Sequence, residues 1–441
     1  MKKKIVLILG LLALALFFRC IFKPKEVLLN EMPNKVVFIL VDTLRAQNLP
    51  FYDYEFNTAP FLNSLQKNSI LFKNFYSTSS YTAPSTASLF TSLYQNDHGV
   101  KQGFVYSKRD SKLKLNRIPQ DVVTLGEMFK ESGYNTFAVS DNLNISEQMG
   151  FNQGFDEMIT NQYVGASKVN KIVLSLKDKI NNSKKSFLYI HYMDPHSPYN
   201  LQKAFARKKG EGKKALRRYD SEISYVDDAI KKLYKAFKWD KDTLIIFTAD
   251  HGEAFGERVN QFGKKERGHG KTLNREVIKV PLFFYMKGLT KKVINFNASH
   301  VDVLPTLASL LNFQKKDYWK GDDLSSFLIS NKKPKKRYLY ADLQGKDKYK
   351  KPDIHSVIFS DYHYILTQKT QDRAQKEEFF SWKNDKLELK SNIESDNYLL
   401  KDMRSRCEDH FNKKSIFNTE TLDLNLDKKT REHLSTLGYI N

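Results

Sequence analysis

A short run of metal-ligand side chains, Asp250, His251 and Glu253, follows a predicted strand in the middle of the chain. The strand is expected at Thr243 to Phe247, a short apolar stretch rich in β-branched residues. An open α/β sheet binds its ligands in the crevice beyond the carboxyl ends of its strands. The same residues also fit a solvated turn with a satisfied histidine, so the metal interpretation depends on partners elsewhere in the chain.

Asp42 and Thr82 occupy comparable positions. Asp42 directly follows the near-continuous apolar run from Lys35 to Val41, which is typical of a strand in a parallel sheet. Thr82 lies just before Pro84, a residue suited to the first turn of a helix. Such a helix N-terminus favours an anion through its amides and its dipole, although a threonine there also serves as an ordinary N-cap.

These residues together suggest a catalytic centre. We expect one divalent cation to be held by Asp42, Thr82, Asp250 and His251. An imidazole among the ligands favours manganese or zinc over calcium or magnesium. Coordination would lower the pKa of the Thr82 hydroxyl and favour the alkoxide, which is the nucleophilic form.

Five further side chains are candidates for contacts with a substrate. His196 and His269 lie in loops after predicted strands, and each is a candidate to bind an oxyanion or to protonate a leaving group. Each histidine taken alone also fits a surface or capping role. Arg45, Lys271 and Lys101 are candidates to contact an anionic substrate, although in so basic a chain each also fits an ordinary surface position.

Composition limits the class of protein. The chain has 441 residues, of which 41% are hydrophobic, and this is enough for a large core. Its formal net charge of +22 indicates attraction to anions, but the lysines are scattered through every segment. No zinc-finger or RNA-recognition signature occurs, so we expect no nucleic-acid partner. Two cysteines, Cys20 and Cys407, exclude a disulfide scaffold and a four-cysteine metal site.

Residues 1–22 are predicted to form an uncleaved signal anchor. A basic start precedes a largely apolar run from Ile5 to Phe22, which spans a bilayer if Arg19 reaches the interface. A cleaved signal peptide and a lipid attachment at Cys20 are the alternatives. We therefore expect the chain to be anchored in a membrane by its N-terminal helix. The catalytic domain would then lie outside the cytoplasm, in the periplasm or at the cell surface.

The remainder of the chain predicts an α/β fold. Residues 23–34 read as a polar tether. Residues 35–335 alternate strands and helices, which predicts a large mixed, mainly parallel sheet flanked by helices in one catalytic domain. Residues 336–441 are richer in short strands and predict a small C-terminal α+β subdomain. The stretch from Gly252 to Gly270 is expected to be a long, glycine-punctuated loop.

Several longer motifs, spread in order along the chain, resemble one known family. They are VVFILVDTLRAQNL (36–49), TAPSTASLFTSLYQNDHGV (82–100), HYMDPHSPY (191–199), TADHGEAFGE (248–257), GHGKTLNREVIKVPLFF (268–284), HVDVLPTLASLL (300–311) and TREHLSTLGYI (430–440). On these motifs the chain resembles the sulfatase-like branch of the alkaline phosphatase superfamily. The resemblance implies a large α/β domain, one active-site cation, and attack by a metal-bound nucleophile on a phosphate or sulfate ester.

The chain departs from true sulfatases at several active-site positions. Thr82 stands where those enzymes have the cysteine or serine that becomes formylglycine, and a threonine cannot form that aldehyde. Thr86 stands where they have an arginine, Thr43 where they usually pair a second aspartate, and His251 where they often have asparagine. A threonine nucleophile with Asp-His-Gly-Glu and a later His-Gly is similar to the phosphoglycerol and phosphoethanolamine transferases of bacterial envelopes.

This resemblance implies a metal-dependent phosphoric ester hydrolase or a phospho-headgroup transferase that works through a covalent phosphothreonine. The expected substrate is an anionic ester, such as a lipid headgroup or an envelope glycan. A sulfuric ester hydrolase is one alternative. A catalytically idle family member that serves as a surface-binding protein is another, and the intact set of candidate ligands argues against it.

Overall fold

The computed structural model describes residues 32–106, 113–208, 213–240, 242–259, 265–330, 332–345, 351–394, 397–418 and 420–424, together with Glu432. The expected signal anchor (1–22) and most of the expected tether (23–34) lie outside these residues, as does the motif at 430–440 except for Glu432. Among the described residues, no helix has both the length and the apolar character needed to cross a membrane.

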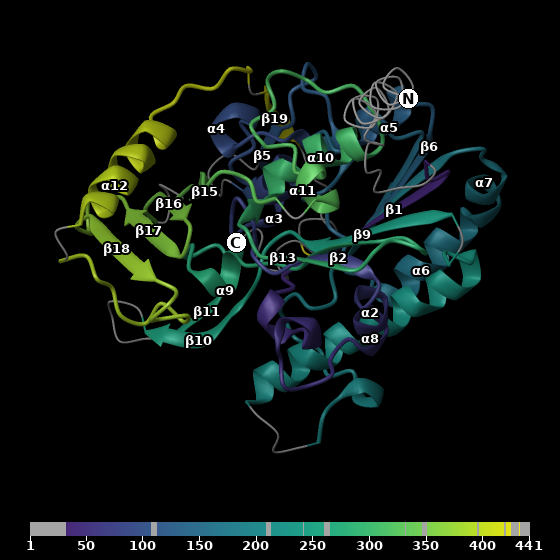
Figure 1. Ribbon diagram of the computed structural model, residues 1–441, viewed down its shortest axis with the longest axis horizontal. Helices are drawn as coiled ribbons and strands as arrows, with labels where there is room; N and C mark the ends of the chain where they lie inside the picture. The colour runs from purple at the N-terminus through teal and green to yellow at the C-terminus, as the bar shows by residue number, and fades with distance from the viewer. Residues whose placement is uncertain are drawn as a thin grey trace, which may run out of the picture.

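The centre of the molecule is an eight-stranded mixed sheet (Figure 1). Its strands are β1 (Lys35–Val41), β2 (Ser69–Phe72), β6 (Asn135–Ser140), β7 (Glu157–Thr160), β8 (Ser186–Tyr192), β9 (Thr243–Ala249), β12 (Leu282–Tyr285) and β13 (Lys292–Ile294). Their order is β13-β2-β12-β9-β1-β8-β6-β7. Strands β9, β1, β8, β6 and β7 are parallel to one another, whereas β12 is antiparallel to both of its neighbours. The prediction of a large, mainly parallel sheet is confirmed.

The three central strands end at the same edge of the sheet. Val41 at the end of β1 pairs with Tyr192 of β8 and with Ala249 of β9. These strands are buried almost throughout, as their continuous apolar sequences predict. The next residues along the chain, which include Asp42 and Asp250, therefore emerge side by side at the carboxyl edge of the sheet.

Helices cover both faces of this sheet, with α2, α6 and α8 on one side and α3, α10 and α11 on the other (Figure 1). The helices of this part are α2 (Pro60–Gln66), α3 (Thr82–Thr91), α4 (Gln95–His98), α5 (Leu125–Glu131), α6 (Ala166–Ser175), α7 (Lys177–Asn182), α8 (Lys214–Phe237), α9 (Arg275–Ile278), α10 (Val303–Leu310) and α11 (Ser325–Ile329). Helix α3 is buried along its whole length. Its alanine, serine and threonine side chains are small and let neighbouring elements approach closely.

The chain beyond residue 335 forms a second, antiparallel sheet. Its strands are β15 (Tyr338–Leu343), β16 (Ile354–Phe359), β17 (Tyr362–Thr367) and β18 (Lys376–Ser381), paired in that order. Helix α12 (Tyr398–Phe411) packs on one face through Leu400, Met403 and Cys407, which lie on one side of the helix. The other face packs on the main body, where Ile358 joins a cluster with Tyr76 and Val277.

This arrangement is the α+β type that the sequence predicts, although the boundary at residue 335 stays a prediction. Strand β19 (Glu420–Leu424) returns to the main body, where it forms a small sheet with β5 (Leu113–Arg117) and β4 (Val105–Tyr106). A further two-stranded sheet joins β3 (Phe75–Tyr76) to β14 (Ala298–Ser299).

The stretch that was expected to be a loop contains a β-hairpin. Strand β10 (Ala254–Val259) pairs with β11 (Lys265–Gly268), and the register shifts between Phe255 and Val259. Gly256 lies inside this irregular part with a φ of 81°, a conformation that favours glycine, so the glycine marks an irregularity within the strand. The hairpin starts directly after Glu253 and ends directly before His269. Strand pairing therefore brings these two residues together.

Candidate active site

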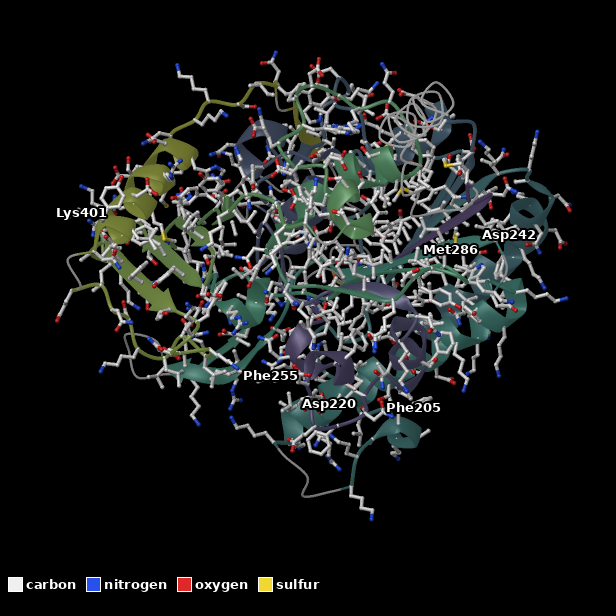
Figure 2. All side chains as sticks on the ribbon, in the orientation of Figure 1. Phe205, Asp220, Asp242, Phe255, Met286 and Lys401 are labelled. Atoms are coloured by element: carbon white, nitrogen blue, oxygen red, sulfur yellow. The ribbon has the colours of Figure 1, made fainter. Side chains whose placement is uncertain are left out.

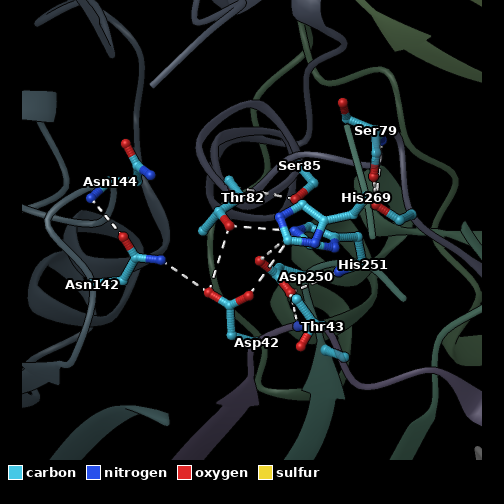
Figure 3. A network of polar contacts seen from close by, with 12 residues as sticks. Asp42, Thr43, Ser79, Thr82, Ser85, Asn142, Asn144, Asp250, His251 and His269 are labelled. Atoms are coloured by element: carbon cyan, nitrogen blue, oxygen red, sulfur yellow. Dashed lines mark hydrogen bonds and ion pairs between the residues drawn. The ribbon is translucent and has the colours of Figure 1, made fainter. Parts of the chain in front are cut away.

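Asp42 is fully buried at the carboxyl end of β1 (Figure 3). Asn142 donates a hydrogen bond from Nδ2 to Asp42 Oδ2 at 2.9 Å, and His191 Nε2 lies 3.4 Å from the same oxygen. The other oxygen, Oδ1, is buried and has no hydrogen-bond partner in this structure. Because an unpaired buried carboxylate oxygen is costly, Oδ1 is suited to a cation.

Asp250 shows the same division between its two oxygens. Its Oδ1 accepts hydrogen bonds from the backbone amides of Thr43, at 3.0 Å, and His251, at 2.7 Å. Its Oδ2 is buried and unpaired in this structure. Burial raises the pKa of Asp250, and the neighbouring Asp42 carboxylate raises it further. A positive charge between the two carboxylates would relieve this repulsion.

His251 directs one ring nitrogen toward the two carboxylates. Its Nδ1 lies 2.9 Å from the carbonyl oxygen of Gly252 and donates to it, because a carbonyl oxygen can only accept. Nε2 therefore keeps its lone pair, and it lies 3.4 Å from Asp250 Oδ2. A backbone contact that fixes the imidazole tautomer in this way is typical of metal-binding histidines.

Thr82 is the first residue of α3, and its side chain points toward these ligands (Figure 3). Its Oγ1 lies 3.3 Å from His251 Nε2 and 3.5 Å from Asp42 Oδ2. Tyr81 occupies the N-cap position, so the Thr82 hydroxyl does not cap its own helix. The hydroxyl is thus held among two carboxylates and an imidazole, at the positively polarised end of a buried helix.

The donor set fits one divalent cation. Asp42, Asp250 and His251 each offer a ligand atom, and these atoms lie within 4.8 Å of one another. Ligands bound tetrahedrally at about 2.0–2.2 Å from an ion lie about 3.3–3.6 Å apart. The separations from His251 Nε2 to Asp250 Oδ2, at 3.4 Å, and to Thr82 Oγ1, at 3.3 Å, match this range. The separation to Asp42 Oδ1, at 4.0 Å, is slightly larger.

His269 and His196 lie beside this set, and their pKa values are shifted in opposite directions. The His269 ring is centred 4.5 Å from that of His251 and 4.9 Å from that of His196. Burial disfavours the imidazolium of His269, but the carboxylate of Glu253, 3.2 Å from Nδ1, outweighs this and raises the pKa. Burial lowers the pKa of His196 to about 4. The pKa values of the two imidazoles are therefore shifted in opposite directions, upward for His269 and downward for His196.

The three predicted substrate cations lie in different surroundings. Arg45 is buried, pairs with Glu257 at 2.5 Å, and stacks over the Phe255 ring, which is labelled in Figure 2. The guanidinium is thus already engaged by protein groups. Lys271 is exposed and donates to a backbone carbonyl at 2.8 Å, and Lys101 lies in the loop after α4. Their contacts with a substrate stay predictions.

The turn after Asp42 is held in a strained conformation. Thr43 has a φ of 55°, which is uncommon for a β-branched residue. Tyr219 of α8 clamps this turn, because its hydroxyl donates to the Thr43 carbonyl at 2.7 Å and accepts from the Arg45 amide at 3.0 Å. This clamp fixes the backbone from which the Asp42 carboxylate projects.

Two residues near Asp42 were not among the predicted site residues. Asn142 follows β6, and the polar run Ser140-Asp141-Asn142 after a buried strand is the same signal that identified Asp42. His191 lies within β8 and is the sixth residue of a strand that otherwise reads as core. Its position beside Asp42 depends on β8 being the neighbour of β1, which the sequence order of the strands does not reveal.

Comparison with known proteins places the chain in a family. A model of the family described as Sulfatase matches residues 34–313. The chain is 25% identical over 370 residues to the ulvan-active sulfatase of Formosa agariphila, covering 71% of this chain and 69% of that protein. It is 25% identical over 320 residues to phosphatidylethanolamine transferase Mcr-2 of Escherichia coli, covering 66% of this chain but only 55% of that protein.

A solved structure supports the shared fold. The crystal structure of Ps i-CgsB superposes with a TM-score of 0.70 at 19% identity, covering 92% of this chain and 98% of that one. This similarity concerns the fold alone. Because the family model matches well over half of the chain, the chain belongs to the Sulfatase family.

Proposed function

We propose that the chain is a metal-dependent enzyme that cleaves or transfers a phosphoric ester through a phosphothreonine at Thr82. The observation that carries this proposal is the position of Thr82 Oγ1, at the start of a buried helix and 3.3 Å from His251 Nε2. Asp42 Oδ1, Asp250 Oδ2 and His251 Nε2 would hold manganese or zinc, which would lower the pKa of the threonine hydroxyl.

The reaction would proceed in two displacements. In the first, the bond from Thr82 Oγ1 to phosphorus forms, the ester P–O bond breaks, and the threonine proton is lost to solvent. The leaving alcohol would take a proton from His269, the imidazole whose pKa is raised by the Glu253 carboxylate. In the second, a water molecule or an acceptor alcohol attacks phosphorus and gives its proton to His269, while the bond from phosphorus to Thr82 Oγ1 breaks and the threonine oxygen takes a proton from solvent. Water makes the enzyme a hydrolase, whereas an alcohol makes it a transferase.

Two kinds of relative support different esters. The similarity to the phosphatidylethanolamine transferase Mcr-2 supports a phosphoric ester, and so does the active-site pattern of Thr82 and His251. The alcohol part of this ester would belong to a lipid headgroup or an envelope glycan. A sulfuric ester is the second candidate, because the ulvan-active sulfatase is equally similar. Thr82 favours the phosphoric ester, since threonine cannot supply the aldehyde of true sulfatases. Action outside the cytoplasm stays a prediction from residues 1–22.

The test is a comparison of esters with a matched pair of variants. The purified full chain, loaded with manganese or zinc, is assayed on aryl phosphate mono- and diesters and on an aryl sulfate. We expect phosphate turnover to exceed sulfate turnover, Thr82→Ala to abolish it, and Thr82→Ser to retain part of it. Full activity in Thr82→Ala would contradict the mechanism, and faster turnover of the sulfate would favour the second candidate.

Metal binding distinguishes the enzyme from a catalytically idle member of the family. A protein that serves only as a surface-binding member of the family would take up no stoichiometric metal. Its Asp250→Ala variant would also show the same Tm as the native chain with or without the added ion. We expect instead that metal raises the Tm of the native chain and that Asp250→Ala removes this rise.

A further inference from the structure

In the loop that follows β18, a charged residue is buried and its two apolar neighbours are exposed. Glu388 is buried, with 1% of its surface exposed, whereas its neighbours Leu387 and Leu389 are 55% and 60% exposed. A carboxylate is normally the residue that faces water, and a leucine the one that is covered. Large exposed apolar side chains held close together mark a surface that contacts something other than water.

Hydrogen bonds to Glu388 hold the loop in this arrangement. The buried carboxylate accepts from His363 Nδ1 and Trp382 Nε1, both at 2.6 Å. It also accepts from Asn274 Nδ2 and the Arg275 amide, both at 3.0 Å. These partners come from β17, from the residue after β18 and from the start of α9, so the loop is fixed to two parts of the fold. The leucines cannot turn inward without breaking these contacts.

The hairpin of β10 and β11 carries a third exposed apolar side chain near this loop. Val259, the last residue of β10, is 63% exposed. Arg258 beside it donates to the carbonyl oxygens of Leu387 and of Glu388, the latter at 2.6 Å. Figure 1 shows β10 and β11 next to β18. We call Val259, Leu387 and Leu389 the apolar patch.

Exposed lysines neighbour the apolar patch in the chain and across the strand pair. Lys383, Lys386 and Lys390 belong to the same loop and are exposed, and Lys265, also exposed, is the strand partner of Val259. Among residues 382–390 the lysines outnumber the one partly exposed acid, Asp385, and the exposed Glu394 follows farther along the loop. Apolar side chains flanked by lysines suit the boundary between the headgroups and the acyl chains of an anionic bilayer.

We propose that the apolar patch and its lysines dock the protein on an anionic lipid surface. Val259, Leu387 and Leu389 enter the interface, and the lysines contact the headgroups. The hairpin that carries Val259 begins directly after Glu253 and ends directly before His269, so it connects the docking surface to the catalytic site. That the reacting ester is itself carried by a lipid rests on the function proposed above.

Binding of the full chain to vesicles tests this docking. Vesicles of phosphatidylcholine with phosphatidylglycerol are compared with vesicles of phosphatidylcholine alone by co-sedimentation. Each variant is scored by the ratio of its binding to the two kinds of vesicle, because the apolar segment at residues 5–22 is expected to bind both. We expect the double variant Leu387→Asp with Leu389→Asp to weaken binding to the anionic vesicles by roughly tenfold or more. The triple variant with Lys383, Lys386 and Lys390 each changed to Glu should do so as well, because each lysine near such a surface contributes about fivefold.

Matched variants elsewhere on the surface separate the patch from general charge. Leu174→Asp replaces another exposed leucine, which is 41% exposed on α6. A triple change of the exposed Lys168, Lys171 and Lys184 to Glu alters the net charge as much as the patch variant does. Both controls keep the native N-terminal segment, and both should bind within about twofold of the native chain.

Three outcomes would overturn the docking proposal. In the first, the patch variants bind vesicles as the native chain does. In the second, the control triple variant loses as much binding as the patch triple variant. In the third, binding depends on the lysines but not on the leucines, and long-chain polyphosphate is bound in preference to vesicles, which would identify a site for a soluble polyanion. Thr82→Ala should bind vesicles normally. Normal docking without any ester turnover would therefore refute the proposed function alone.

Discussion

Replacement of Asn142 by alanine should weaken metal binding without removing a ligand. The amide of Asn142 donates to Asp42 Oδ2 at 2.9 Å, inside a fully buried site. This contact occupies Oδ2 and leaves Oδ1 directed at the other candidate ligands. Without it, the Asp42 carboxylate gains freedom to rotate, and a buried oxygen loses a donor. Asn142 therefore acts as a positioning residue for the carboxylate.

The size of the effect follows from the kind of bond that is lost. A hydrogen bond to a charged group contributes about 1.5–3 kcal/mol. At about 1.4 kcal/mol for each factor of ten, this corresponds to roughly 10- to 150-fold in affinity. Loss of a residue that orients a metal ligand typically costs about 10- to 100-fold. We therefore expect the Kd for zinc or manganese to rise by about one to two factors of ten.

Isothermal titration of metal into the metal-free protein measures this change directly. Gln153→Ala is the matched control, because Gln153 is also a buried amide but donates to the carbonyl oxygens of Ile118 and Gly150. It should lower the Tm and leave the Kd for metal unchanged. Native-like metal affinity in Asn142→Ala would refute the reasoning, because it would show that Asp42 needs no orientation by its amide partner.

Other replacements test separate parts of the structure. Glu253→Gln should lower the pKa of His269, so the alkaline limb of the kcat profile moves to lower pH and kcat at pH 8 falls by about tenfold. Glu388→Gln should reduce the free energy of unfolding by about 2–4 kcal/mol in urea titrations. Burial raises the pKa of Glu388 but His363 lowers it to about 2, so its stabilisation is present above pH 4.5 and is lost as the pH falls toward 2. In thermal scans, His300→Leu should lower the Tm, because its Nε2 lies 3.0 Å from the carbonyl oxygen that precedes Asp250.

The candidate ligands could be predicted from sequence because strand ends in a parallel sheet converge. Asp42 and Asp250 each directly follow a continuous apolar run, and the pairing of β1 with β9 brings them together. Thr82 could be placed at a helix N-terminus because Pro84 suits the first turn of a helix, and α3 begins at Thr82. These inferences needed only the local character of each segment and the general rule for the carboxyl edge of a sheet.

The residues that orient these ligands depend on strand order, which local sequence does not contain. Asn142 reaches Asp42 because β6 lies two strands from β1, and His191 does so because β8 lies between them. In the sequence, β6 and β8 are separated from β1 by long segments of chain. The side chain of His191 also sits inside an apolar strand, where a histidine is ordinarily a core residue.

The burial of Glu388 in the loop after β18 could not be predicted from the sequence either. Leu387-Glu388-Leu389 reads as an ordinary alternation with a solvated glutamate, whereas the structure buries Glu388 against His363 and Trp382. The donors that stabilise the carboxylate come from segments distant in the chain. The hairpin between Glu253 and His269 was expected to be a loop because of its repeated glycines. In the structure, Gly256 and a shift of register interrupt the strand pairing without abolishing it.

Trapping of the covalent intermediate tests the central claim most directly. The metal-loaded full chain is mixed with a phosphodiester substrate, quenched in acid within one turnover, digested, and examined by mass spectrometry. We predict a phosphoryl adduct on the peptide that contains Thr82, located on Thr82 itself, and its absence from the Thr82→Ala variant. An active enzyme that shows no adduct on Thr82, or an adduct on another side chain, would contradict the account.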